Sequence, residues 1–386
     1  MNRHSRLGLR DEGPPPGSMN VLCPGQWSVL NLRRTPVPTF IPLLTFAAIS
    51  AMPMQNPDPV TTQGPPTQEM ARVLDQLKAY KNPPLPSLPV PQARQLPNAS
   101  YAVMEVLARD NKPATDPTIA VTHTTVPGPG GPLVVRIYRP KDAGNQILPV
   151  AVYFRGGGWT IADLNTYDAS CRAISKMANC MVASVSYRSG PENKFPAAHE
   201  DSYAAYQYLS RNAGTLRGDA ARMAVIGESA GGNLANAVSM MARDRGGAVP
   251  KGQVLVYPVT QLGAITESYR QNQNSAPLDV PTLMWMGKNY TKSPADFQSK
   301  YLSPLSRATD ADLRRLPPTT IILAEIDPLR TEGFQYAARL KGLGVTTATH
   351  FYKGMTHEFF GMGAVLKEGM EAEEVAADAL KVAFGS

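Results

Sequence analysis

The sequence predicts an α/β fold with a mostly parallel, eight-stranded sheet that is covered by helices on both faces. Two observations support this prediction. From residue 118 onward, short runs rich in β-branched and aromatic residues alternate with segments of helical periodicity. From the run PVAVYF at residues 149–154 onward, the alternation has the rhythm of parallel strands that are joined by crossover helices.

Composition limits the classes of function. The chain has 386 residues, of which 43% are hydrophobic and 18% are charged, enough for a large core. The formal charge of +7 is scattered, with no Lys/Arg block among aromatic residues, so we expect no nucleic-acid partner. No apolar run reaches the roughly 18 to 20 residues that span a bilayer, so we expect no integral membrane span. Cys171 and Cys180 are expected to be small buried residues, not a disulfide, and their spacing fits no metal site.

The first 65 residues are expected to precede the fold. In residues 1–51, two arginines at 33–34 precede the apolar stretch PTFIPLLTFAAISAM, which has the length of a secretory signal and ends in small residues. A cleaved signal peptide predicts a secreted or periplasmic protein, and the alternative is a Pro-rich leader on a cytoplasmic protein. Residues 52–65 are interpreted as a Pro-rich linker without apolar periodicity.

A small helical unit is expected over residues 66–115, ahead of the main domain at 116–386. Its first helix is indicated by apolar side chains at helical spacing, at Met70, Val73, Leu74 and Leu77. A second helix is expected over 100–109. The stretch NPPLPSLPVP between them is expected to form no regular structure, because proline interrupts helices.

The main domain is expected to hold all eight strands. These are placed at 118–126, 133–139, 149–154, 181–188, 222–227, 252–258, 319–325 and 347–353. Helices are expected at 165–177, 197–211, 230–243, 329–343 and 368–384. Residues 261–303 break the alternation, with one helix-like stretch, VPTLMWMGKNY, in otherwise polar loop. We interpret them as an insertion above the carboxyl ends of the strands, where α/β sheets bind ligands.

The most specific motif is Gly-Glu-Ser-Ala-Gly at residues 227–231. It follows an apolar strand and opens a helix, which is the context of a nucleophile elbow. Small residues at its ends allow a sharp turn, and the helix N-terminus favours negative charge that develops at the serine. Ser229 is therefore the candidate nucleophile, and the alternative is a purely structural glycine turn.

A serine hydroxyl needs a base to take its proton, and after an elbow of this kind the acid and then the histidine follow in the chain. Two histidines follow Ser229. His350 lies within an alternating strand, whereas His357 lies in the loop KGMTHEFFGM, from which a side chain can reach over the sheet edge. We therefore predict that His357 is the base. The HEFFG segment has no second histidine four residues on, so it does not match a zinc-protease helix.

Asp327 is the predicted acid. It ends the strand TTIILAEID and precedes Pro328, so it is expected at the carboxyl rim of the sheet. Glu325 would point the same way but nearer the core, and Asp310 and Asp312 lie in a charged surface segment. The alternative role for Asp327 is an N-cap for the following helix.

A second glycine-rich stretch, FRGGGWT at residues 154–160, follows the third expected strand. Acyl transfer places negative charge on the former carbonyl oxygen, and backbone N–H groups that point at this oxygen contribute strongly to catalysis. The N–H groups of Gly157, Gly158 and Ala230 form the predicted oxyanion hole. A phosphate-binding loop is the competing interpretation, but no Gly-Lys-Ser/Thr follows and no GxGxxG is present.

Five segments together resemble the bacterial hormone-sensitive-lipase-like esterases of the α/β-hydrolase fold: FRGGGW, SVSYRSGPENKFPAAHED, GESAGGNLA, LPPTTIILAEIDPLRTEG and YKGMTHEFF. The resemblance covers about residues 66–384. It implies a carboxylesterase with the triad Ser229, Asp327 and His357, and it implies no cofactor and no metal. It also implies a cap over the site, built from the N-terminal helices and the insertion near 261–303.

The chain departs from this family at two places near the site. Arg155 stands where the family usually has histidine. With Gly156 it belongs to the supporting part of the oxyanion loop and supplies none of the N–H groups. Arginine donates hydrogen bonds but accepts none, so we expect this substitution to affect the rigidity of the loop and the catalytic rate. YRSGPE stands where the family more often has Leu-Ala before Pro-Glu, and we expect Arg188 and Glu192 to be structural.

The sequence thus predicts a serine carboxylic-ester hydrolase that acts on short- to medium-chain esters through an acyl-enzyme intermediate. The alternatives are a lipase on longer-chain acylglycerols and a catalytically weak, small-molecule-binding member of the same fold. The expected partner is a small-molecule ester. The sequence leaves open whether the protein forms a homodimer.

Overall fold

The computed structural model describes residues 58–386, and the predicted signal peptide within 1–51 lies outside this range. In the described residues the sheet has eight strands in the order β1-β2-β4-β3-β5-β6-β7-β8. The β2 strand pairs antiparallel with β1 and β4, and all other neighbours are parallel. This confirms the predicted fold class. The strands are β1 (Ile119–Val126), β2 (Leu133–Pro140), β3 (Leu148–Phe154), β4 (Met181–Val185), β5 (Gly218–Glu228), β6 (Gln253–Val256), β7 (Thr319–Ile326) and β8 (Thr347–Thr356).

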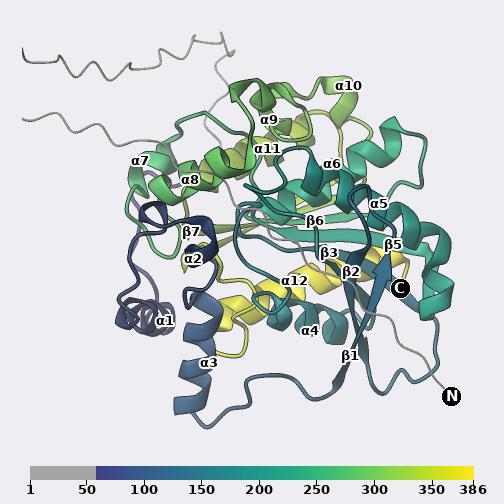
Figure 1. The fold of residues 1–386 in the computed structure, drawn as a ribbon, viewed down its shortest axis with the longest axis horizontal. Helices are drawn as coiled ribbons and strands as arrows, with labels where there is room; N and C mark the ends of the chain where they lie inside the picture. Colours follow the sequence, from purple (N-terminus) through teal and green to yellow (C-terminus); the bar gives the residue numbers. More distant parts are fainter. Residues whose placement is uncertain (1–57) are drawn as a thin grey trace, which may run out of the picture. The chain divides into compact units, whose positions relative to one another are not determined.

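Helices cover both faces of the sheet (Figure 1). One face packs against α5 (Ala197–Asn212), α6 (Ala230–Asp244) and α11 (Arg330–Gly342). The other face packs against α4 (Asp168–Met177) and α12 (Lys367–Phe384). Side chains along β3 alternate between the two cores: Val150 and Val152 enter the first, and Ala151 and Tyr153 the second. The sheet therefore separates two apolar layers, as the predicted α/β architecture requires.

Two groups of helices lie near the carboxyl ends of the strands (Figure 1). The first is α1 (Gln68–Ala79), α2 (Val90–Ala93) and α3 (Ala99–Arg109), and the second is α7 (Glu267–Gln271) and α8 (Val280–Tyr290). Side-chain caps start four of them, where Thr67, Asn98, Thr266 and Asp279 accept backbone N–H groups of the first turn of α1, α3, α7 and α8. Short helical segments complete the fold: α9 (Pro304–Arg307), α10 (Asp310–Leu313) and the 3-10 turns at Leu85–Ser87, Ala213–Leu216 and Pro294–Gln298.

Some predicted boundaries need correction. The proline-rich stretch at 82–91 was expected to be irregular, but it contains a 3-10 turn and the start of α2, because proline is tolerated in the first turn of a helix. The helix expected from residue 165 begins at Asp168, since the Asp163 carboxylate accepts the N–H groups of residues 165 and 166 and holds a turn there. The fourth strand, expected to reach residue 188, ends at Val185, and Arg188 beyond it bonds instead to the carboxylate of Asp201.

Residues 58–65 contact the catalytic part of the chain. The Asp58 carboxylate pairs with the buried Arg330 guanidinium, and the Gly64 N–H donates to Glu325 at 2.9 Å. The predicted domain boundaries themselves stay a prediction. None of the described helices combines the length and apolar character needed to cross a bilayer. Cys171 and Cys180 are buried free thiols, as the sequence indicates.

Candidate active site

Ser229 lies at the sharp turn between β5 and α6. Its backbone has φ 57° and ψ −118°, a strained conformation for a non-glycine residue that costs on the order of 1–3 kcal/mol. A Cβ atom on Gly227 would collide with the carbonyl of Gly231, and one on Gly231 with the carbonyl of Phe154. The Ser229 N–H donates to the Val256 carbonyl at 2.8 Å, which ties the turn to β6. Close packing thus presents the hydroxyl at the N-terminus of α6.

Asp327 and His357 directly follow the neighbouring parallel strands β7 and β8. His357 Nδ1 lies 2.7 Å from Asp327 Oδ2, and both side chains are buried. The other carboxylate oxygen accepts the Leu329 N–H at 2.8 Å, so Asp327 also supports the turn that leads into α11. Because Nδ1–H donates to a carboxylate, Nε2 is left as the nitrogen that can take a proton.

The environment of His357 favours its charged form. Burial lowers the pKa of its imidazole. The charge and the hydrogen bond of Asp327, with the charges of Glu358 and Glu228, outweigh this effect and raise the pKa above the ordinary value of 6.5. A histidine in this setting is a stronger base than a free imidazole, as proton abstraction from a serine requires.

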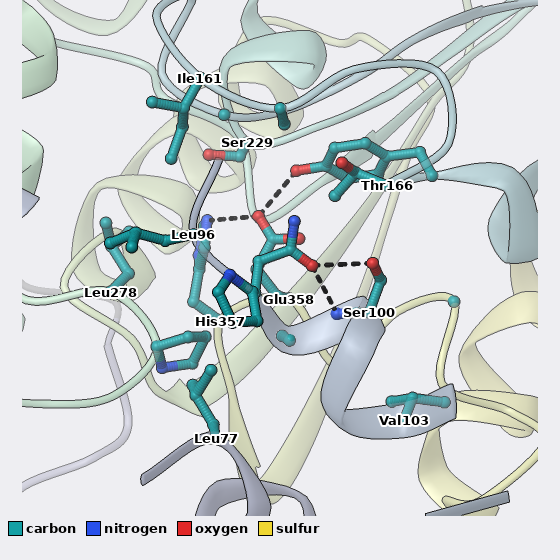
Figure 2. A pocket seen from close by; sticks show the side chains of 18 of the residues that line it. Leu77, Leu96, Ser100, Val103, Ile161, Thr166, Ser229, Leu278, His357 and Glu358 are labelled. Atoms are coloured by element: carbon teal, nitrogen blue, oxygen red, sulfur yellow. Dashed lines mark hydrogen bonds and ion pairs between the residues drawn. The ribbon is translucent and has the colours of Figure 1, made fainter. Parts of the chain in front are cut away.

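Ser229 and His357 line the same cavity, which has a volume of about 1050 Å³ (Figure 2). Within residues 58–386 no hydrogen bond joins the two side chains. In ligand-free enzymes such bonds are often long, and they shorten when substrate binds. Apolar side chains from the N-terminal helices, the oxyanion loop and the insertion form much of the wall, among them Leu77, Leu96, Val103, Ile161 and Leu278.

The loop after β3 brings backbone N–H groups to this cavity. Gly157 has φ 88° and Gly158 has φ 57°, in the left-handed region that favours glycine. A Cβ atom on Gly157 would collide with the Ile161 carbonyl. Among the described residues, no acceptor binds the N–H groups of Gly157, Gly158 or Ala230. Three free donors therefore lie in the two segments that flank the serine hydroxyl, where an oxyanion would need them.

Arg155 is buried beneath this loop. Its guanidinium donates to the carbonyls of Gly156 at 3.2 Å and Ile161 at 2.9 Å, and to the Ser189 hydroxyl at 2.8 Å. It also stacks 4.2 Å from the centre of the Tyr187 ring. The Tyr187 hydroxyl in turn donates to the Arg155 carbonyl at 2.8 Å. The arginine that replaces the family's usual histidine is thus integrated into the loop by hydrogen bonds and stacking.

Two acidic residues near the site were not singled out from the sequence. Glu228 precedes the serine and is fully buried, and the Tyr153 and Tyr257 hydroxyls donate to its two oxygens. Burial, followed by the charge of Glu358, raises the pKa of Glu228 to about 8, against the effect of these hydrogen bonds. Glu358 follows the histidine and points into the cavity. The sequence did carry a signal for both residues, because each lies directly beside a predicted catalytic residue: Glu228 before Ser229 and Glu358 after His357.

The other candidates for the acid and the base do not line the cavity that holds Ser229 and His357. The two oxygens of Glu325 accept the N–H groups of Gly64 and Gly354. His350 lies in the middle of β8, and Asp310 and Asp312 pair with basic residues on α11 and elsewhere at the surface. Arg188 pairs with Asp201 and Glu192 with Arg94, which agrees with structural roles. Among residues 58–386 no group of three or more His, Cys, Asp or Glu side chains could hold a metal ion.

Comparison with known proteins identifies the family. Residues 151–361 match the family model described as alpha/beta hydrolase fold. Esterase LipI of Mycobacterium tuberculosis is 33% identical over 294 residues, which span 76% of this chain and 91% of LipI. The chain belongs to the hormone-sensitive-lipase-like family of α/β hydrolases.

Further relatives of this α/β hydrolase agree with the assignment. An ethyl acetate hydrolase of Pseudomonas putida is 33% identical over 254 residues, 65% of this chain and 79% of that protein. The structure of a hyperthermophilic esterase from Pyrobaculum calidifontis is similar with a TM-score of 0.75 at 38% identity. The similarity covers 83% of this hydrolase and 99% of that chain. The resemblance inferred from five sequence segments is therefore confirmed over most of the chain.

Proposed function

We propose that this chain hydrolyses short- to medium-chain carboxylic esters through an acyl-enzyme intermediate on Ser229. That it is a serine carboxylesterase follows from its family and from relatives that are named esterases. The assignment to particular residues rests mainly on one observation: His357, which pairs with Asp327 at 2.7 Å, lines one cavity with Ser229. The serine, the acid and the base come from the ends of three parallel strands.

The mechanism follows from this geometry. Ser229 Oγ attacks the ester carbonyl while its proton moves to His357 Nε2, and Asp327 holds and balances the imidazolium. The N–H groups of Gly157, Gly158 and Ala230 bind the resulting oxyanion. When the intermediate collapses, the C–O bond to the alcohol breaks and Nε2 returns the proton to the leaving oxygen. A water molecule then gives a proton to His357 Nε2 and attacks the acyl-enzyme carbonyl. The bond from the acyl carbon to Ser229 Oγ breaks, Nε2 returns the proton to Oγ, and the acid is released.

The chain-length preference is supported by one relative, and the cavity is large enough for such esters. A cavity of about 1050 Å³ with apolar walls has room for a small or medium ester. The related Pseudomonas putida protein is named for the hydrolysis of ethyl acetate, an ester with a two-carbon acyl chain. A lipase on longer chains is the second candidate, since the exposed apolar residues Tyr101, Met104 and Met284 on α3 and α8 could face lipid.

The test compares the full chain with its Ser229→Ala variant on p-nitrophenyl acetate, butyrate, octanoate and palmitate. We expect rates that fall at the long acyl chains, and we expect the variant to lose at least about a thousandfold in kcat while keeping its far-UV circular dichroism. Substantial activity in the folded variant would refute Ser229 as the nucleophile. Highest activity on palmitate would instead favour a lipase.

Export and self-association are separate proposals for the whole chain. The arginine pair at 33–34 and the apolar stretch after it support a cleaved signal and hence a secreted or periplasmic protein, with a cytoplasmic protein as the alternative. N-terminal sequencing of the protein from its native host tests this, because an uncleaved N-terminus argues against export. Light scattering on the purified protein tests whether it forms a homodimer.

A further inference from the structure

Glu358 places a second carboxyl group beside the imidazole of His357. Glu358 Oε1 lies 3.9 Å from His357 Nε2 (Figure 2). Asp327 bonds to the opposite nitrogen, Nδ1. The Tyr167 hydroxyl donates to Glu358 Oε1 at 2.8 Å, which fixes the carboxyl group in this position. The side chain is 23% exposed and lines the cavity that also holds Ser229. The carboxyl group is therefore held at the nitrogen that exchanges protons during catalysis.

The backbone at Glu358 is strained. Its φ of 70° lies in the left-handed region, which is unfavourable for a non-glycine residue and accessible to glycine. Strained non-glycine residues of this kind cluster at functional sites, where the surrounding structure enforces them. The surrounding structure thus holds a glutamate in a backbone conformation that glycine would adopt more easily.

The remaining charged and titratable groups around His357 define the field that it experiences. They are Asp327 after β7, Glu228 at the end of β5, Tyr257 after β6 with its ring 4.4 Å away, and Tyr167 ahead of α4. No lysine or arginine among residues 58–386 forms an ion pair with Asp327, Glu228 or Glu358. The carboxyl groups are thus not neutralised by other cations.

The two additional acids differ in how they are held. Glu228 has both oxygens bonded to tyrosine hydroxyls, and burial raises its pKa to about 8. Burial also raises the pKa of Glu358, but the positive charge of His357 and the hydrogen bond from Tyr167 act in the opposite direction. Glu358 therefore ionises most readily when His357 carries its proton.

We propose that Glu358 is a positioning residue that stabilises the imidazolium form of His357 from the side opposite Asp327, and thereby sets the pH range of the esterase. This inference rests on the proposed function, in which His357 is the base. In each turnover the serine proton moves to His357 Nε2 and then to the leaving alcohol. Glu358 takes no part in these proton transfers and acts by its negative charge on the imidazolium.

The direction of the expected effect follows from the role of the base. His357 must be neutral to accept the serine proton, so kcat/KM rises with pH through the pKa of His357 in the free enzyme. A negative Glu358 raises that pKa and moves the acidic limb to higher pH. Removal of the charge should move the limb to lower pH. It should also lower the rate on the plateau, because the imidazolium that forms is less stable.

The experiment measures kcat/KM on p-nitrophenyl butyrate from about pH 5 to about pH 9 for the full chain, Glu358→Gln and Glu358→Gly. The matched control is Glu374→Gln, which removes an equal charge from an exposed position on α12. We expect the acidic limb of both Glu358 variants to move down by about 0.5 to 1 pH unit, and that of the control to stay in place. Glu358→Gly should also unfold at an equal or higher temperature, since it relieves the strained backbone.

An unmoved acidic limb in folded Glu358→Gln overturns the inference. Ser229→Ala is measured in parallel, because its result separates the two proposals. If Ser229→Ala is inactive and the limb does not move, the triad stands and the role of Glu358 is wrong. If Ser229→Ala retains its activity, the proposed function fails, and the inference that is built on it fails with it.

Discussion

Arg155 connects the two sides of the proposed oxyanion loop. Its guanidinium bonds to the carbonyls of Gly156 and Ile161, which lie on either side of the two glycines whose N–H groups are free. The histidine that the family usually has here could not make as many bonds, because imidazole has two nitrogens and guanidinium has five donors. The buried Arg155 Nε nevertheless has no partner among the described residues, so arginine does not satisfy the site fully.

Replacement of Arg155 by alanine should weaken catalysis more than substrate binding. Without the guanidinium, the loop can move and its N–H groups no longer converge on the oxyanion, so we expect kcat to fall by about tenfold with a smaller change in KM. Steady-state kinetics on p-nitrophenyl butyrate measure both constants. Arg222→Ala, at a partly exposed pair with Asp219, is the control that should change neither. An unchanged kcat in Arg155→Ala would show that the loop is rigid without it.

At the scale of elements, residues 58–65 form a strap that supports the turn between β7 and α11. The Asp58 carboxylate bonds to Arg330 Nε at 3.0 Å and to the Thr331 hydroxyl, and both members of the Asp58–Arg330 pair are fully buried. Arg330 lies three residues after Asp327. The Gly64 N–H donates to Glu325, which lies two residues before Asp327. The strap thus fixes the segment that positions the predicted catalytic acid.

The Asp58→Ala variant tests this support. It would leave the buried Arg330 without its carboxylate, and loss of one partner of a buried ion pair typically lowers the free energy of unfolding by about 3–5 kcal/mol. Urea denaturation measures the change. The double variant Asp58→Ala/Arg330→Met removes the uncompensated charge and should recover much of the loss. If Asp58→Ala is as stable as the parent chain, the strap does not contribute to the fold.

The contacts of the strap could not be predicted from the sequence. Strands and helices of the main domain were predicted to within a few residues, because their apolar periodicity is local. The Asp58–Arg330 pair joins residues that are 272 positions apart, and no local pattern marks either as the partner of the other. The helix α7 was missed for a related reason. It is short, and it is stabilised by contacts such as that of the Ser268 hydroxyl with the Pro328 carbonyl.

At the scale of the whole molecule, the site is assembled from the ends of four strands. The elbow after β5, the proposed base after β8 and the glycine loop after β3 meet at one cavity, and the proposed acid after β7 pairs with that base. These segments are separated by up to about 200 residues in the sequence. The sequence could predict these four segments because each carries a motif at a strand end. It could not predict that Glu228 and Glu358 would add two further acids around His357, since this depends on the packing of three strands.

The most direct test of the account is to map where an organophosphorus inhibitor reacts. The full chain and its His357→Ala variant are incubated with paraoxon, digested and analysed by mass spectrometry. If His357 activates Ser229, the parent chain should carry one phosphoryl group on the peptide that contains Ser229, with loss of esterase activity, and His357→Ala should react far more slowly. Labelling of another residue with the same loss of activity, or equal labelling of Ser229 in His357→Ala, would contradict the proposed catalytic centre.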